Sequence, residues 1–168
     1  MLSVSVLGGG GQSFILKPLG IDRTTRVSLV MSTEMNKTLA KRYFEAYSSG
    51  NIEAVMKFTG VKYGLHPGGN GKLMNSIERR KDEVVFFRAF SDIRAVVEDQ
   101  IAENDKVANR ITMTCTHSGE YQGILGTGKR IVIPYIDITR FEGGKIVEEW
   151  VEFDINGIVQ QIKTSNAQ

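Results

Sequence analysis

The sequence predicts an α+β fold in which helices come first and a strongly curved, mainly antiparallel sheet follows. Two observations predict it: apolar residues recur at helical spacing up to about residue 90, and from there on they alternate with a period of two. Helices grouped ahead of antiparallel strands pack together on one face of the sheet. A chain of 168 residues with 41% hydrophobic residues is long enough for one domain with its own core.

The first 33 residues differ from the rest of the chain. Four consecutive glycines and Pro18 interrupt any helical period, so we expect residues 1–33 to form a mobile leader. Met31 directly precedes the first strongly patterned segment, and translation could start there. We therefore expect a single domain over residues 34–163 and a short tail over 164–168.

Two helices are predicted at the start of this domain. Ser32 or Thr33 can cap the first helix, and Gly50 can end it in the left-handed conformation. Asn51 can then begin a second, short helix that runs to Phe58.

A glycine-rich segment and a third helix follow. Residues 59–71 contain five glycines and Pro67, which predicts a loop. A helix is expected over about residues 73–90, and the mixed charges of residues 78–83 are typical of a solvated helix face. The apolar residues expected to face inward are Leu73, Ile77, Val84 and Phe87.

The rest of the domain, more than half of its length, has the pattern of antiparallel strands joined by tight turns. Asn104-Asp105 and residues 142–144 are predicted turns, and Asn156-Gly157 is a strong hairpin signal. The expected strands cover residues 93–102, 106–117, 129–141, 145–154 and 158–162.

Alternation along these strands turns two chemically active side chains inward. His117 lies on the mainly apolar side of strand 106–117, and Asp137 lies in an otherwise uncharged run of strand 129–141. Burial disfavours the charged form of a carboxylate and raises its pKa, which suits a general acid or base at neutral pH. Asp137 could instead lie on the solvent face or pair with Arg110 or Arg140. A backbone carbonyl could satisfy His117.

Neither a metal nor a disulfide is expected. Cys115 and His117 project to one side of a strand, but zinc sites need three or four ligands and the only other histidine, His66, lies in the predicted loop. A single cysteine cannot form an intrachain disulfide.

Charge and hydropathy exclude two classes of partner. With 21 basic and 19 acidic residues the net charge is +2, which gives no reason to expect a nucleic acid. No apolar run reaches the roughly 18 residues that span a bilayer, and no signal-peptide pattern is present, so we expect a cytoplasmic protein.

Several segments taken together resemble the SnoaL-like polyketide cyclase family, also called ester cyclases. The resemblance covers roughly residues 36–162. The segments that carry it are residues 90–93, 97–99, 104–108, 116–123, 126–129 and 137–150, followed by Asp154 and 160–161.

This resemblance implies a nuclear-transport-factor-2-like cone, in which a bent sheet wraps around about three helices and encloses a deep apolar pocket. Family members close a polyketide ring by intramolecular aldol condensation of a methyl ester, without cofactor or metal. Their catalytic aspartate corresponds to Asp137 and their assisting histidine to His117. A homodimer formed through the outer sheet face is also implied.

We therefore expect an enzyme that performs acid–base chemistry on an apolar or aromatic, carbonyl-bearing small molecule. Asp137 would move the proton, and His117 would bind the carbonyl oxygen and stabilise the enolate. A non-catalytic ligand-binding domain, and a hydratase or isomerase that uses Glu152 or Asp154, remain open alternatives. The residues expected to line the pocket are His66, Tyr43, Tyr63, Phe90, Tyr135, Trp150 and Asp154.

Overall fold

The structure, a computed structural model, describes residues 23–68 and 71–164, with side chains from residue 32 onward. The part of the expected leader before residue 23 and the tail from 165 on lie outside the described residues. Among the residues described, no helix is both long and apolar enough to cross a membrane.

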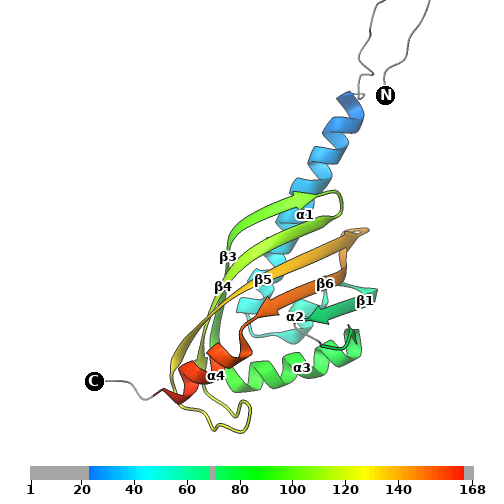
Figure 1. Ribbon diagram of the computed structural model, residues 1–168. Helices are drawn as coiled ribbons and strands as arrows, with labels where there is room; N and C mark the ends of the chain where they lie inside the picture. The colour runs from blue at the N-terminus through cyan, green and yellow to red at the C-terminus, as the bar shows by residue number, and fades with distance from the viewer. Residues whose placement is uncertain (1–22, 69–70, 165–168) are drawn as a thin grey trace, which may run out of the picture.

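The described residues form an α+β fold, as the sequence predicts (Figure 1). The helices and strands follow one another in this order: α1 (Arg23–Ser48), α2 (Ile52–Met56), β1 (Thr59–Pro67), β2 (Met74–Asn75), α3 (Ser76–Ala89), β3 (Phe90–Glu103), β4 (Lys106–His117), β5 (Arg130–Glu142), β6 (Lys145–Phe153) and α4 (Ile155–Lys163).

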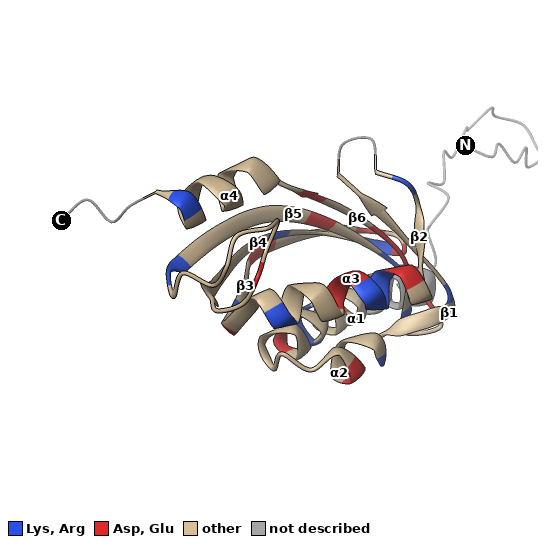
Figure 2. Ribbon diagram, turned by 90° about the horizontal axis from the view of Figure 1, so that it is seen from below, with Lys and Arg blue, Asp and Glu red and all other residues tan. Residues whose placement is uncertain are grey.

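The six described strands make one curved sheet in the order β2-β1-β6-β5-β4-β3. All neighbouring strands are antiparallel except β1 and β6, which run parallel, so the sheet is mixed. Figure 2 shows the sheet arching over α1 and α3, which lie on its concave side. The main core fills the space between these layers.

Helix α1 begins earlier than the sequence analysis expects. It starts at Arg23, so Ser32 and Thr33 lie inside the helix and neither is its cap. No proline or glycine occurs between Arg23 and Ser48, so nothing in this stretch breaks the helix. The predicted end is confirmed, because Gly50 has a φ of 63° and Asn51 caps α2.

Strand β1 replaces the loop that the glycines predict over residues 59–71. Tyr63 and Leu65 are buried on its inner side, and the strand pairs with β6. A Cβ added at Gly64 would come within 3.2 Å of the Leu73 side chain, so this glycine serves close packing rather than a turn. Alternation of buried residues here outweighs the glycine content.

Helix α4 replaces the predicted last strand. Asp154 caps it by accepting a hydrogen bond from the Gly157 backbone N–H at 2.9 Å, so the Asn156-Gly157 pair lies in a first helical turn and not in a hairpin. Ile158 and Ile162 are buried four residues apart, which is the spacing of one helix face.

Helix α3 is shorter than predicted and turns a different face inward. Asn75 and Glu78 form a capping box at its start, and Leu73 and Ile77 are 53% and 68% exposed. The expectation that both face inward is therefore wrong, as is the expectation that residues 78–83 are uniformly solvated. Glu83 is one of the buried residues of this helix.

Strands β4 and β5 follow the predicted alternation. Every second residue of β4 from Val107 to His117 is buried, and the strand has the predicted bounds. In β5, Ile133, Asp137 and Phe141 are buried in the same way. The sheet thus brings Asp137 to its concave face.

Candidate active site

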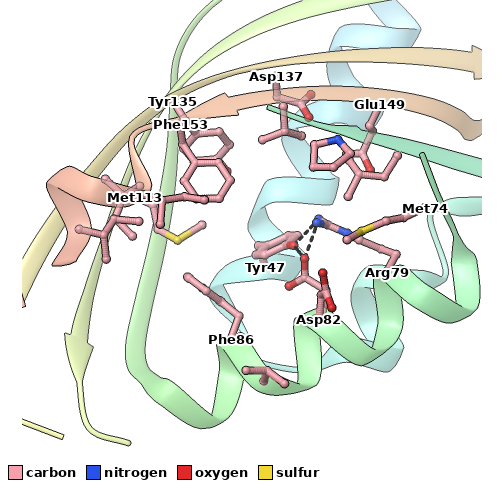
Figure 3. Close-up of a pocket in the computed structure, with 18 of the residues that line it drawn as sticks. Tyr47, Met74, Arg79, Asp82, Phe86, Met113, Tyr135, Asp137, Glu149 and Phe153 are labelled. Carbon is pink, nitrogen blue, oxygen red and sulfur yellow. Dashed lines mark hydrogen bonds and ion pairs between the residues drawn. The ribbon is translucent and has the colours of Figure 1, made fainter. Parts of the chain in front are cut away.

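A cavity of about 440 Å³ lies between the concave face of the sheet and the helices (Figure 3). Its volume falls in the range of pockets that bind small molecules, roughly 300–1,000 Å³. Most of its wall is apolar. The aromatic residues that line it are Tyr43, Phe44, Tyr47, Phe86, Tyr121, Tyr135 and Phe153.

Asp137 lies in this wall, on β5, and its side chain is buried at 1% exposure. Asn109, directly across on β4, donates a hydrogen bond from Nδ2 to Asp137 Oδ1 at 3.2 Å. The two arginines that could have paired with it have other partners, because Arg110 pairs with Asp99 and Arg140 with Glu148. Asp137 is therefore a cavity residue and not a solvent-facing strand residue.

A second carboxyl group, that of Glu149 on β6, lies beside Asp137. Asp137 is opposite Val151 and Thr139 is opposite Glu149, so the two carboxyl residues are diagonal neighbours on one sheet face. Glu149 is fully buried, and the Tyr63 hydroxyl donates a hydrogen bond to Glu149 Oε2. The other carboxylate oxygen of Glu149, Oε1, is buried and has no hydrogen-bond partner among the described residues.

The pKa of Asp137 is well above its ordinary value. Burial contributes most to this rise, and the negative charge of Glu149 contributes next. The hydrogen bond from Asn109 and the charge of Arg79 act in the opposite direction without cancelling it. Asp137 therefore keeps its proton to higher pH than an exposed aspartate does, which suits a general acid.

Glu149 is absent from the residues that sequence reasoning selects, because a β-bulge reverses the alternation of β6. Arg140 pairs with Glu148 while the next residue, Phe141, pairs with Ile146, so the register shifts by one residue at this point. The apolar residues Val151 and Phe153 follow Glu149 at every second position, so they mark the side of β6 that faces the cavity. The sequence therefore contains a pattern that places Glu149 on this side.

His117 does not join Asp137. It lies eight residues along β4 from Asn109, the residue opposite Asp137, which corresponds to about 26 Å of strand. Its ring packs 5.5 Å from that of Phe90, and its Nδ1 accepts a hydrogen bond from the Thr127 backbone N–H at 3.3 Å. Burial lowers the pKa of His117. The expected aspartate–histidine pair is thus not assembled in the cavity.

Of the other predicted pocket residues, some line the cavity or contact its carboxyl groups, and others lie elsewhere. Tyr43 and Tyr135 line the cavity as expected, and Tyr63 donates a hydrogen bond to Glu149. Phe90 is a core residue that packs against His117.

Three further candidates lie away from the cavity. His66 and Trp150 stack at 5.2 Å on the opposite face of the sheet, where His66 also contacts Glu148 at 2.9 Å. Asp154 is exposed and caps α4. The bulge in β6 accounts for Trp150, since it reverses the side on which this residue projects.

The cavity also contains Arg79, a basic residue that the sequence analysis assigned to a solvated helix face. Its side chain is 14% exposed and lies 2.7 Å from Glu83, with the two residues four apart on α3. It also donates hydrogen bonds to the hydroxyls of Tyr43, at 3.4 Å, and Tyr47.

Within the described residues, no group of three or more His, Cys, Asp or Glu side chains could hold a metal ion.

Comparison with known proteins gives one family and many similar structures. The family model of the SnoaL-like polyketide cyclases matches residues 37–162. AclR from Streptomyces galilaeus, a proposed hydroxylase, is 25% identical with a TM-score of 0.73 over 81% of this chain and 85% of that chain. A search of curated proteins found no match.

Two further structures have the same fold. A proposed polyketide cyclase from Acidithiobacillus ferrooxidans is 26% identical, with a TM-score of 0.68 over 77% of this chain and 94% of that chain. IdmH from Streptomyces antibioticus, also a proposed polyketide cyclase, is 23% identical, with a TM-score of 0.68 over 77% and 99% of the two chains.

Proposed function

Because the chain belongs to the SnoaL-like polyketide cyclase family, we propose that it performs cofactor-independent acid–base chemistry on an apolar, carbonyl-bearing small molecule. An aldol-type ring closure is the reaction that suits this site best. The observation that carries the proposal is the buried pair of Asp137 and Glu149, which are diagonal neighbours in the wall of an apolar cavity. This carboxyl pair takes the place of the expected aspartate and histidine.

The pair can serve as both base and acid in one catalytic cycle. Its ionised oxygen removes a proton from the carbon next to the substrate carbonyl, and the electron pair of that C–H bond forms an enolate. The enolate carbon attacks a second carbonyl of the same molecule, which forms the new C–C bond and leaves an alkoxide. The carboxyl pair then returns the proton to this alkoxide, so that protons and charge balance.

The first prediction is that Asp137→Asn lowers the rate of proton abstraction by about 10²- to 10⁴-fold, because it removes the acid–base group. The measurement is deuterium incorporation at the α-carbon of aromatic methyl esters and ketones in D₂O, followed by NMR. Glu149→Gln is expected to lower the rate as well. Glu152→Gln, on the same strand but exposed, is the matched control and should keep the wild-type rate.

Two results would count against this proposal. Wild-type exchange rates in folded Asp137→Asn would remove Asp137 from the mechanism. An aromatic ester that binds the wild type but is recovered without deuterium would support the alternative, a non-catalytic ligand-binding domain.

A hydratase or isomerase that uses the same residues is a second candidate. This reaction needs another polar group near Asp137, and Glu149 is such a group, whereas Glu152 and Asp154 are exposed. Incorporation of ¹⁸O from labelled water into the product separates hydration from ring closure. For either reaction we expect a homodimer formed through the outer face of β4, where Arg110 is exposed.

A further inference from the structure

We propose that Arg79 binds the carbonyl oxygen of the substrate and stabilises the negative charge that develops there when the enolate forms. This inference rests on the proposed function, and it assigns to Arg79 the role that the sequence suggested for His117. Arg79 lies on α3, across the cavity from the strands that carry Asp137 and Glu149 (Figure 3).

The guanidinium group of Arg79 leaves part of its donor capacity unused. Both of its hydrogen bonds, to Tyr43 and Tyr47, and its close contact with Glu83 involve the same nitrogen, Nη2. Within the described residues, Nε and Nη1 make no hydrogen bond, and neither is a buried unpartnered atom. The N–H groups of Nε and Nη1, which lie on different edges of the guanidinium, therefore remain available to an acceptor oxygen in the cavity.

Arg79 is held in position by its neighbours. Tyr43, Tyr47 and Glu83 are 1%, 5% and 4% exposed, so the groups that contact Nη2 are themselves fixed in the core. The guanidinium carbon lies 5.8 Å from the centre of the Tyr47 ring, which adds a cation–π contact. A donor that is fixed before the substrate arrives stabilises a transition state without reorganising.

The charge of Arg79 also acts on the opposite wall of the cavity. Burial raises the pKa values of Asp137, Tyr63 and Tyr135, and the charge of Arg79 partly opposes this rise in all three. The positive charge is therefore close enough to the carboxyl pair to influence a substrate held between them. Proton abstraction by the pair and charge development at the oxygen beside Arg79 would occur on opposite sides of one substrate.

This arrangement favours a neutral carbonyl compound over a carboxylate. Glu83 already compensates the charge of Arg79, and the carboxyl pair is negative whenever it holds a single proton. A permanent anion would meet these acidic groups, whereas a neutral ketone or ester brings no charge. When the enolate forms, the proton moves to the pair and the total charge of the cavity is unchanged.

The test uses 2-naphthol, a fused aromatic alcohol whose ionised form mimics an enolate oxygen. At a pH where the free alcohol is neutral, we expect bound 2-naphthol to show the absorbance of the naphtholate, because Arg79 stabilises the ionised form of the oxygen that it holds. 2-Methylnaphthalene, which lacks the oxygen, and 2-naphthoate, a permanent anion, should each bind at least tenfold more weakly.

Two variants separate the role of Arg79 from its contribution to folding. Arg79→Lys keeps the positive charge beside Glu83 but loses the Nε and Nη1 donors. The double variant Arg79→Met/Glu83→Gln removes both charges, so that no carboxylate is left uncompensated in the core. We expect both variants to bind the naphthol in its neutral form and to lower α-proton exchange by about 10²- to 10³-fold, as loss of an oxyanion donor does.

Arg80→Met is the matched control, because Arg80 is the next residue of α3 and its exposed side chain pairs with Glu53. It should retain the naphtholate signal. The inference is wrong if wild-type protein does not ionise 2-naphthol, or if the folded Arg79 variants ionise it as well as wild type does. Full exchange activity in Asp137→Asn, together with loss of the naphtholate signal in the Arg79 variants, would refute the acid–base proposal and leave the oxygen-binding role of Arg79 intact.

Discussion

At the scale of single residues, the site depends on hydrogen bonds that hold carboxyl groups inside an apolar wall. Tyr63 is such a residue, since its hydroxyl donates to Glu149 Oε2 while the rest of its side chain is buried. Without this donor, one buried carboxylate oxygen would lose its partner, which costs about 1–3 kcal/mol. Tyr63 is thus a positioning residue that acts on the reaction through Glu149.

We predict that Tyr63→Phe lowers the free energy of unfolding by about 1–3 kcal/mol. It should also lower the rate of α-proton exchange, because Glu149 loses the hydrogen bond that fixes its carboxyl group beside Asp137. Urea unfolding and exchange rates between pH 5 and 9 measure the two effects. Tyr135→Phe is the control, since the Tyr135 hydroxyl makes no hydrogen bond to the described residues. An unchanged exchange rate in Tyr63→Phe would contradict this coupling.

How far the sequence predicts the site also depends on single residues. Alternation alone places Asp137 and His117 on the inner face, and both are buried there. It cannot show that they lie far apart along their strands, because that depends on which residues pair across the sheet. The sequence does not single out Arg79, because a run of charged residues on a helix predicts a solvent-exposed face. Its spacing of four residues from Glu83, however, is that of an ion pair on one helix face.

At the scale of elements, α4 closes one end of the cavity through Ile155 and Ile158. Its short length makes it dependent on its cap, and Asp154 provides this cap. We predict that Asp154→Ala destabilises the protein by about 1 kcal/mol, the usual cost of a lost cap, and lowers affinity for aromatic ligands. Thermal unfolding and 2-naphthol titration measure the two effects.

The conservative variant Asp154→Asn separates capping from charge. Asparagine caps helices about as well as aspartate, so this variant should behave like wild type. Equal destabilisation by Asp154→Asn and Asp154→Ala would show that the carboxylate acts through its charge and not as a cap.

The elements that sequence reasoning misses have a common physical cause. Strand β1 contains glycines and α4 contains Asn156-Gly157, and both patterns predict turns when they are read locally. Tertiary contacts decide otherwise, because β1 pairs with β6 and α4 buries Ile158 and Ile162. The long strands β4 and β5 depend on alternation over a dozen residues, and their positions were predictable for that reason.

At the scale of the whole molecule, the sheet and helices enclose more carboxyl groups than they neutralise. Burial raises the pKa of both Asp137 and Glu83, so the folded protein keeps protons that the unfolded chain releases above about pH 4. The folded state then binds more protons than the unfolded state, and the free energy of unfolding falls as pH rises from that point toward the raised pKa values. The catalytic cavity is therefore maintained at a cost in stability at neutral pH.

This cost leads to a prediction in which activity and stability change in opposite directions. Asp137→Asn keeps the shape of the side chain but cannot ionise, so it should match wild type near pH 4 and become more stable than wild type as pH rises. At pH 7.5 we expect a melting temperature about 2–4 °C higher, which corresponds to about 1 kcal/mol in a domain of this size. Thermal unfolding between pH 4 and 8 measures the difference, and Glu152→Gln should follow wild type throughout. Because the comparison is between variant and wild type, carboxylates with lowered pKa values, such as Glu148, contribute equally to both and cancel. A stability difference that is the same at every pH would mean that Asp137 is not held in its protonated form, and the catalytic assignment of the carboxyl pair would lose its physical basis.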